Sequence, residues 1–180
     1  MNLDNIKASL ERNNNITKEI KDNIFELVVI FNHNFPNVNL DGLMNRLSTL
    51  KIARSSRFIS DDVSRYDIKE NTLYLNIYQM KKNYDMRHIF MFELLNIITC
   101  NGKCVGFASS DIFNALNRGY TEIMANFLVG NNGEELVFPK EAIMANMISI
   151  IVGDDNMKQC YFNNSAELLL SYLEKAGVDL

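Results

Sequence analysis

The sequence predicts an α+β fold: a predominantly helical domain with a small antiparallel or mixed sheet before a central buried helix. The run Met86–Cys100 (MRHIFMFELLNIITC) is apolar at nearly every position from Ile89 to Ile98, which is typical of a helix buried on all sides. Between Lys51 and Tyr78, apolar and polar residues alternate in short runs, as they do in strands. Most of the remaining chain repeats its apolar residues every three or four positions, the period of an amphipathic helix.

The composition indicates one domain and excludes several classes of partner. A chain of 180 residues that is 47% hydrophobic can build one good core. We divide residues 1–180 into N-terminal helices (1–50), a small sheet (51–80) and a helical part (84–180). The net charge of −4 argues against nucleic acid and anionic membranes, since phosphate groups require a basic face. No apolar run has the length of a membrane span and no signal peptide is visible, so we expect a cytoplasmic protein with its three cysteines reduced.

Local signals define the first helices. A short helix is expected over residues 2–12, ended by the turn Asn13-Asn14-Asn15. Thr17 is a typical N-cap for a second helix, which should end near Asn32–Asn34 because the residue before Pro36 avoids the helical region. The apolar stripe of this helix comprises Ile20, Ile24, Leu27, Val28 and Phe31. Asp41 should begin another short helix, with Leu43, Met44, Leu47 and Leu50 on its apolar side.

Short strands follow before the central helix. We expect them at Ile52, 57–59, 66–68 and 72–78, separated by turns at Asp61-Asp62 and Lys69-Glu70-Asn71. In the last strand, Leu73, Leu75 and Ile77 alternate with Tyr74, Asn76 and Tyr78. One face of that strand should therefore be packed and the other half-solvated.

The remaining chain is expected to be helical. Gly102 should stop the central helix, and a short helix over 110–116 should precede a second key helix from Arg118 to Val129. Phe138-Pro139 should open a helix that continues to Ile151. Its inward residues are predicted to be Ala142, Ile143, Met147, Ile150 and Ile151. Residues 152–155 should break this helix, and Ser165 should cap a last one over 166–176.

Glu93 needs an explanation, because burying a carboxylate is costly unless something pairs with it. Residues 92–96, Phe-Glu-Leu-Leu-Asn, resemble the HExxH helix of zinc metallopeptidases (zincins, of the gluzincin type) with both histidines replaced. In the intact motif, two histidines one helical turn apart hold the zinc ion, and the glutamate polarises the bound water as general base. The ligand positions are here Phe92 and Asn96, while the glutamate is retained as Glu93.

The resemblance continues downstream. Asn117-Arg118-Gly119-Tyr120-Thr121-Glu122 resembles the helix that carries the third, glutamate ligand of these enzymes, and Glu122 follows Glu93 by 29 positions. Residues 122–127 also resemble a segment of the regulatory metallopeptidase associated with phage repressors, a variant within the same fold. Phenylalanine cannot bind zinc, and an asparagine amide is a poor replacement for imidazole. The resemblance therefore implies a zincin-like fold that has lost its metal and uses no cofactor.

Glu93 and Glu122 are the pair that we single out, because two acids that once shared a dication must now be protonated, paired or hydrated. Arg118 is a candidate counter-ion, although we favour a surface ion pair between Arg118 and Glu122 and a structural, hydrogen-bonded role for Glu93. A hard cation held by Glu93, Asn96 and Glu122 is an open alternative. His88 points about 140° away from Glu93 on a straight helix and is expected to be a satisfied core histidine.

Tyr74 and Tyr78 are further binding candidates, because in the metallopeptidases that the chain resembles an edge strand before the active-site helix binds extended substrate. We interpret the protein as a pseudoenzyme, a catalytically inactive zincin-like protein of the bacterial or phage cytoplasm that binds a protein or peptide partner. Two alternatives stay open: a metal-independent enzyme that uses Glu93 as acid and base in an apolar cleft, and a structural subunit of a larger assembly.

Overall fold

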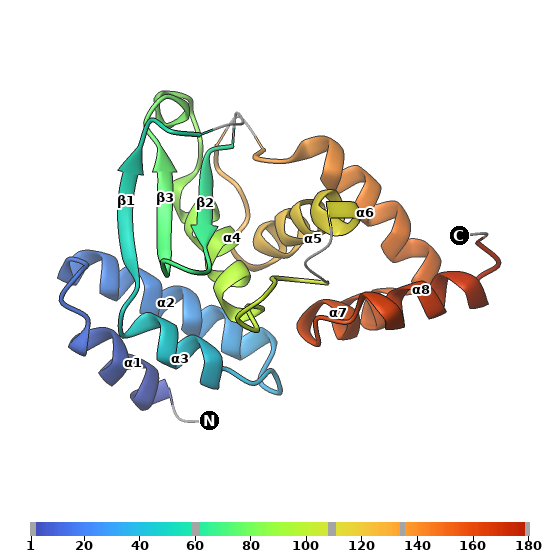
Figure 1. Ribbon diagram of the computed structural model, residues 1–180, viewed down its shortest axis with the longest axis horizontal. Helices are drawn as coiled ribbons and strands as arrows, with labels where there is room; N and C mark the ends of the chain where they lie inside the picture. Colours follow the sequence, from blue (N-terminus) through green and yellow to red (C-terminus); the bar gives the residue numbers. More distant parts are fainter. Residues whose placement is uncertain (1–2, 59–61, 108–110, 134–135, 179–180) are drawn as a thin grey trace.

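The computed structural model of the protein describes residues 3–58, 62–107, 111–133 and 136–178 and confirms a predominantly helical α+β fold (Figure 1). The N-terminal helices are α1 (Leu3–Arg12), α2 (Lys18–Asn34) and α3 (Asp41–Leu47). The sheet contains β1 (Lys51–Ser55), β2 (Ser64–Asp67) and β3 (Thr72–Asn76), followed by the short 3-10 helix η1 (Gln79–Lys81). The later helices are α4 (Met86–Ile98), α5 (Asp111–Val129), α6 (Pro139–Val152), α7 (Asp154–Phe162) and α8 (Ala166–Lys175). None of the described helices combines the length and the apolarity needed to cross a bilayer.

The sheet is mixed, with the strand order β1-β3-β2. β1 runs parallel to β3 and β2 runs antiparallel to it, so that Arg54 and Ser64 both lie opposite Leu75. β3 is therefore the central strand, and β1 and β2 form the two edges. The strand predicted at 57–59 is wrong for its described part, because β1 ends at Ser55 and neither Arg57 nor Phe58 belongs to a strand. Ile59 lies outside the described residues.

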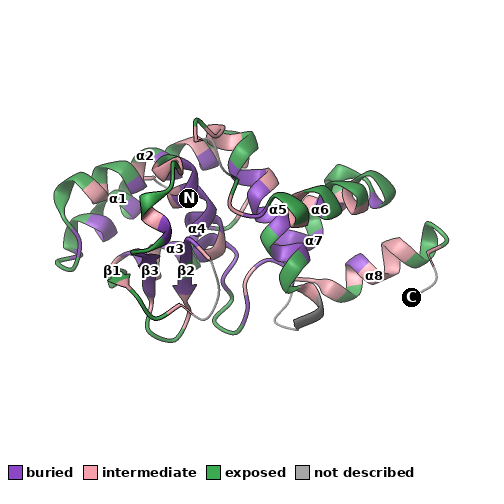
Figure 2. Cartoon of the chain, turned by 90° about the horizontal axis from the view of Figure 1, so that it is seen from above, coloured by how far each residue is buried: buried purple, intermediate pink, exposed green. Residues whose placement is uncertain are grey.

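α4 lies at the centre, between the sheet and α1–α3 on one side and α5–α8 on the other (Figures 1 and 2). Asp85 begins the helix, because its carboxylate accepts hydrogen bonds from the backbone N–H groups of Arg87 and His88. One hydrophobic core contains residues from α1 through to α8, and α4 contributes most of its length to it. The helix is apolar all round because it has neighbours on every side.

α5 is one continuous helix, and the prediction of two helices over 110–116 and 118–129 was wrong. The glycine in Asn117-Arg118-Gly119 suggests a helix break if only the neighbouring residues are considered. In the fold, Gly119 marks a close approach: a Cβ atom added there would lie 1.9 Å from the backbone oxygen of Glu141 in α6. The glycine therefore lets the backbones of α5 and α6 touch, without interrupting α5.

α6 contradicts the predicted orientation of its apolar residues. Ile143, Met147, Ile150 and Ile151 were expected to face inward, but they are 66%, 61%, 74% and 49% exposed. Ala145 and Val152 form the buried side instead. Because α6 is apolar on both sides, its sequence period does not indicate which face packs on α5. The break after Val152 is confirmed, since Gly153 has φ 88°, but α7 follows at once and was not predicted.

The caps at Thr17 and Ser165 are confirmed. The Thr17 side chain accepts a hydrogen bond from the backbone N–H of Ile20, and the Ser165 side chain accepts one from that of Leu168. Both side chains satisfy donors that a helix leaves unpaired in its first turn. α2 also ends at Asn34, as the proline at position 36 predicts.

Candidate functional site

Glu93 is buried on α4, with only 1% of its surface exposed, and both of its carboxylate oxygens are hydrogen-bonded. Ser64 Oγ, on the edge strand β2, donates to Oε1 at 2.5 Å, and Asn96 Nδ2, on the next turn of α4, donates to Oε2 at 3.0 Å. The backbone N–H of Tyr66 is a third donor. Burial raises the pKa of Glu93, although the hydrogen bonds from Ser64 and Asn96 oppose that shift.

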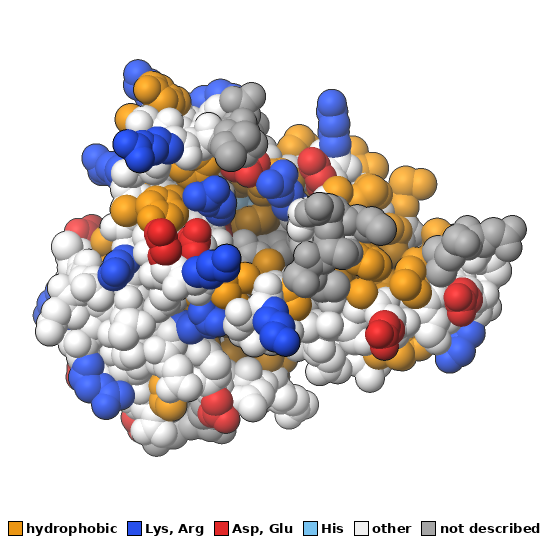
Figure 3. Space-filling view, in the orientation of Figure 1, with side chains coloured by type: hydrophobic (Ala, Val, Ile, Leu, Met, Phe, Trp, Pro, Cys, Tyr) orange, Lys and Arg blue, Asp and Glu red, His pale blue; other side chains and the backbone are white. Residues whose placement is uncertain are grey.

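A cavity of about 230 Å³ lies beside Glu93, between β2 and α5. Phe92, Asn96 and Arg118 line it with Glu93, so the positions that the metallopeptidase resemblance singles out on α4 share one cavity. The Arg118 guanidinium is bound to the carboxylate of Asp62 at 3.0 Å and lies over the ring of Phe138. Figure 3 shows the hollow between the sheet and the α5–α6 half, with basic and acidic side chains at its rim.

Glu122 belongs to a different polar cluster. His88 Nε2 lies 2.9 Å from Glu122 Oε1, and His88 Nδ1 lies 2.9 Å from the backbone oxygen of Gly130. The backbone N–H of Val137 also donates to Glu122 Oε1, at 3.3 Å. His88 and Glu122 are each only 1% exposed. His88 is therefore the satisfied core histidine that the sequence predicts.

The fold does not bring the predicted pair of acids together. Glu93 lines the cavity, whereas Glu122 binds His88 on another side of α4. The favoured Arg118–Glu122 surface pair was also wrong, because Glu122 is buried and Arg118 pairs with Asp62. The three oxygen donors Glu93, Asn96 and Glu122 consequently do not converge on a cation. No group of three His, Cys, Asp or Glu side chains in the described ranges is arranged to hold a metal ion.

Tyr74 and Tyr78 lie away from the cavity. Tyr74 is on β3, which is the central strand and not an edge, and its hydroxyl donates to the carboxylate of Glu70. Tyr78 follows β3 and is 62% exposed. The edge strand next to the cavity is β2, whose Ser64 and Tyr66 contact Glu93. The sequence did not indicate that β2 is the edge strand next to the cavity, because strand order depends on contacts between residues that are distant along the chain.

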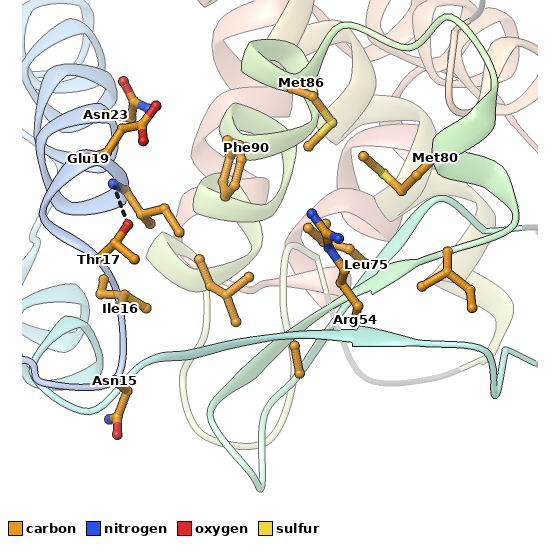
Figure 4. Close-up of a pocket in the computed structure, with 14 residues that line it drawn as sticks. Asn15, Ile16, Thr17, Glu19, Asn23, Arg54, Leu75, Met80, Met86 and Phe90 are labelled. Atoms are coloured by element: carbon orange, nitrogen blue, oxygen red, sulfur yellow. Dashed lines mark hydrogen bonds between the residues drawn. The ribbon is translucent and has the colours of Figure 1, made fainter.

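A larger groove lies at the other edge of the sheet, and sequence reasoning missed it. It has a volume of about 790 Å³ and opens between β1 and the first turns of α2. Figure 4 shows Glu19 and Asn23 of α2 on one side, Phe90 and Met86 of α4 in the middle with Met80 across from α2, and Arg54 and Leu75 of the sheet below them. Arg54 is the one cation and Glu19 the one acid among the described residues that line it. Apolar side chains and a strand edge meet in this groove, which is larger than the cavity beside Glu93.

Replacing Glu93 by glutamine should remove a pH dependence of stability. A carboxyl group whose pKa is raised in the folded state stabilises the native state while it is protonated. This stabilisation is lost as the pH rises from the ordinary pKa of the group through its folded-state pKa. We expect the unfolding free energy of the wild type to fall, relative to Glu93→Gln, as the pH rises through that range. Urea unfolding at several pH values measures this difference. Glu167→Gln, at an exposed site on α8, is the control, and a difference that does not vary with pH would contradict the prediction.

The fold and these two sites define a helical α+β protein with a buried carboxylate beside a small cavity and a groove along a free strand edge. Neither family profiles, nor curated proteins, nor solved structures match the chain. The resemblance to the HExxH helix therefore stays a prediction based on residues 92–96 and 117–122.

Proposed function

We propose that this protein is a metal-free counterpart of the HExxH metallopeptidases that acts by binding an extended peptide segment of a partner protein. The observation that carries the binding function is the free edge of β1 beside a groove of about 790 Å³. Extended peptides commonly bind by adding a strand to such an edge, where backbone hydrogen bonds supply affinity and neighbouring pockets supply specificity.

The chemistry of the Glu93 cavity supports the absence of metal catalysis. The motif positions that would carry imidazole ligands are a phenyl ring and an amide, at Phe92 and Asn96. Asp62, the other acid among the described residues of the cavity wall, is already bound by Arg118, which leaves Glu93 without a second free carboxylate for a dication. Three donors already occupy the Glu93 carboxylate, so we assign Glu93 to holding β2 against α4.

The backbone geometry of β1 supports strand addition. The N–H of Lys51 donates to Asn71 and the oxygen of Ser55 accepts from Ile77, so these two residues face β3. Alternate residues of an edge strand direct their backbone groups outward, which places those of Ile52 and Arg54 on the open side. Both residues line the groove, and the surface of Arg54 is exposed. The segment that fits best is an extended one with apolar side chains and an acidic residue opposite Arg54.

An array of short peptides with acidic and apolar residues in varied order tests this function. We expect some of these peptides to bind, and Arg54→Glu to weaken binding at least about tenfold, or about 1.4 kcal/mol, by replacing attraction with repulsion. Arg57→Glu is the matched control, because Arg57 is exposed but does not line the groove. Fluorescence polarisation gives the dissociation constants. Equal loss in both variants, or cleavage of the peptides that requires added zinc or manganese and the Glu93 carboxylate, would overturn the proposal.

A further inference from the structure

The outer face of α6 carries a group of exposed apolar side chains. Ile143, Met147 and Ile150 are each more than 60% exposed, and Met144 and Ile151 flank them on the same helix at 37% and 49%. Figure 3 shows hydrophobic side chains gathered over the position that α6 occupies in Figure 1. Contiguous apolar patches of this kind are rare on monomers and mark surfaces that another body covers.

The chemistry of this face favours a protein surface as its cover. Between Glu141 and Asp154 the chain has no charged residue. A helix that lies on an anionic membrane usually has several lysine or arginine side chains along its polar flank. α6 has only Lys140, at its start, and Asp154 and Asp155 follow its end. Those two acids would be repelled by anionic lipid, whereas the two methionines adapt readily to another packed helix.

We propose that the outer face of α6 is the contact surface of a symmetric homodimer, in which α6 packs antiparallel on α6 of a second copy. A two-fold axis requires a self-complementary surface, and the ends of α6 provide one. Ile143 and Ile151 are both four residues from Met147, Lys140 lies in the first turn of α6, and Asp154 and Asp155 begin α7 just past the last turn of α6. An axis near Met147 therefore places Ile143 beside Ile151 of the second copy, and brings Lys140 to the end of the second α6, next to the acids that begin its α7.

The charges at the two ends are available for this pairing. Lys140 is exposed, and it forms no ion pair within the described residues. Asp154 pairs with Lys158 of its own chain, but Asp155 beside it is fully exposed, so the acidic end carries more negative charge than Lys158 neutralises. Antiparallel packing also places the positive end of each helix dipole beside the negative end of the other. The charges thus specify the antiparallel orientation, and the apolar side chains between them supply the contact.

Light scattering after size-exclusion chromatography tests the dimer. We expect the wild type to have about twice the chain mass of 20.7 kDa at micromolar concentration. Met147→Glu brings two like charges together at the axis and should give a monomer whose circular dichroism and thermal unfolding resemble those of a dilute wild-type sample. Tyr78→Glu is the control: Tyr78 is similarly exposed at 62% but lies outside α6, so this variant should stay dimeric.

A charge exchange keeps the inference testable if Met147→Glu fails to fold. Lys140→Glu should weaken dimerisation about tenfold, and adding Asp154→Lys and Asp155→Lys in the same chain should restore it. A monomeric wild type at micromolar concentration would overturn the inference. So would a dimer that both Met147→Glu and Lys140→Glu leave intact, because its contact would then lie elsewhere, such as the edge of β1. Neither result depends on peptide binding at β1.

Discussion

Gly119→Ala is expected to destabilise the protein by about 3 kcal/mol, an unusually large effect for the addition of one methyl group. The added carbon would lie 1.9 Å from the oxygen and 2.2 Å from the carbonyl carbon of Glu141, and 2.8 Å from the nitrogen of Ala142. All three atoms belong to the backbone of the first turn of α6, which cannot rotate away as a side chain would. α6 must therefore move off α5, and buried contacts such as that of Ala145 must loosen with it.

The sign of this effect is informative because helix propensity predicts the opposite. In a helix without close neighbours, alanine is more stable than glycine by about 1 kcal/mol. Gly42→Ala is a matched control on α3, since its added carbon would lie 3.9 Å from its nearest neighbour, the oxygen of Cys100. We expect Gly42→Ala to be neutral or slightly stabilising in urea unfolding followed by circular dichroism. If Gly119→Ala were as stable as the wild type, α5 and α6 would not be in backbone contact.

Gly119 also illustrates which parts of the fold the sequence predicts. The beginnings of α2 and α8 were predicted, because Thr17 and Ser165 act on N–H groups a few residues away. The burial of α4 was predicted as well, since a helix that is apolar all round requires neighbours on all sides. The continuity of α5 was not predicted, because Gly119 is explained by its contact with the backbone of α6, more than twenty residues further along the chain.

The candidate site shows the same division between local and distant information. The burial of Glu93 and the different direction of His88 both follow from the geometry of one helix. The partners of these two residues do not follow from that helix. Glu93 is bound by Ser64 of β2, and His88 is bound by Glu122 of α5. Arg118 was assigned to Glu122 because residues four apart on a helix are neighbours. Its actual partner, Asp62, precedes β2 and becomes a neighbour only when the sheet packs beside α5.

Breaking the His88–Glu122 pair should have the largest effect of any single polar substitution. Both atoms that face the His88 ring are oxygens: the backbone oxygen of Gly130 and Oε1 of Glu122. A ring with two acceptors is best satisfied when both nitrogens carry protons, so this geometry favours an imidazolium facing a carboxylate. Burial alone lowers the pKa of His88, but the hydrogen bond and the charge of Glu122 outweigh it, and the pKa is raised overall.

His88→Gln is expected to cost about 3–5 kcal/mol of unfolding free energy, because it leaves Glu122 buried without its cation. Glu122 has little else to compensate its charge: Oε1 retains the N–H of Val137, and Oε2 has no hydrogen-bond partner among the described residues. His33→Gln is the control, since His33 is exposed on α2 and is the only other histidine of the chain. A loss below about 1 kcal/mol in His88→Gln would mean that the pair is not ionised in the native state.

The pH dependence distinguishes an ion pair from mere packing. A histidine with a raised folded-state pKa stabilises the native state fully below its ordinary value of about 6.5, and that stability is lost as the pH rises through the raised value. In Glu122→Gln the effect of burial prevails, the pKa of His88 should fall below its ordinary value, and stability should then increase as the pH rises toward neutrality. Urea unfolding measures both slopes, and proton NMR follows the two histidine rings directly, with His33→Gln identifying the signal of His88. Equal slopes in the wild type and in Glu122→Gln would show that the carboxylate does not hold the proton on His88.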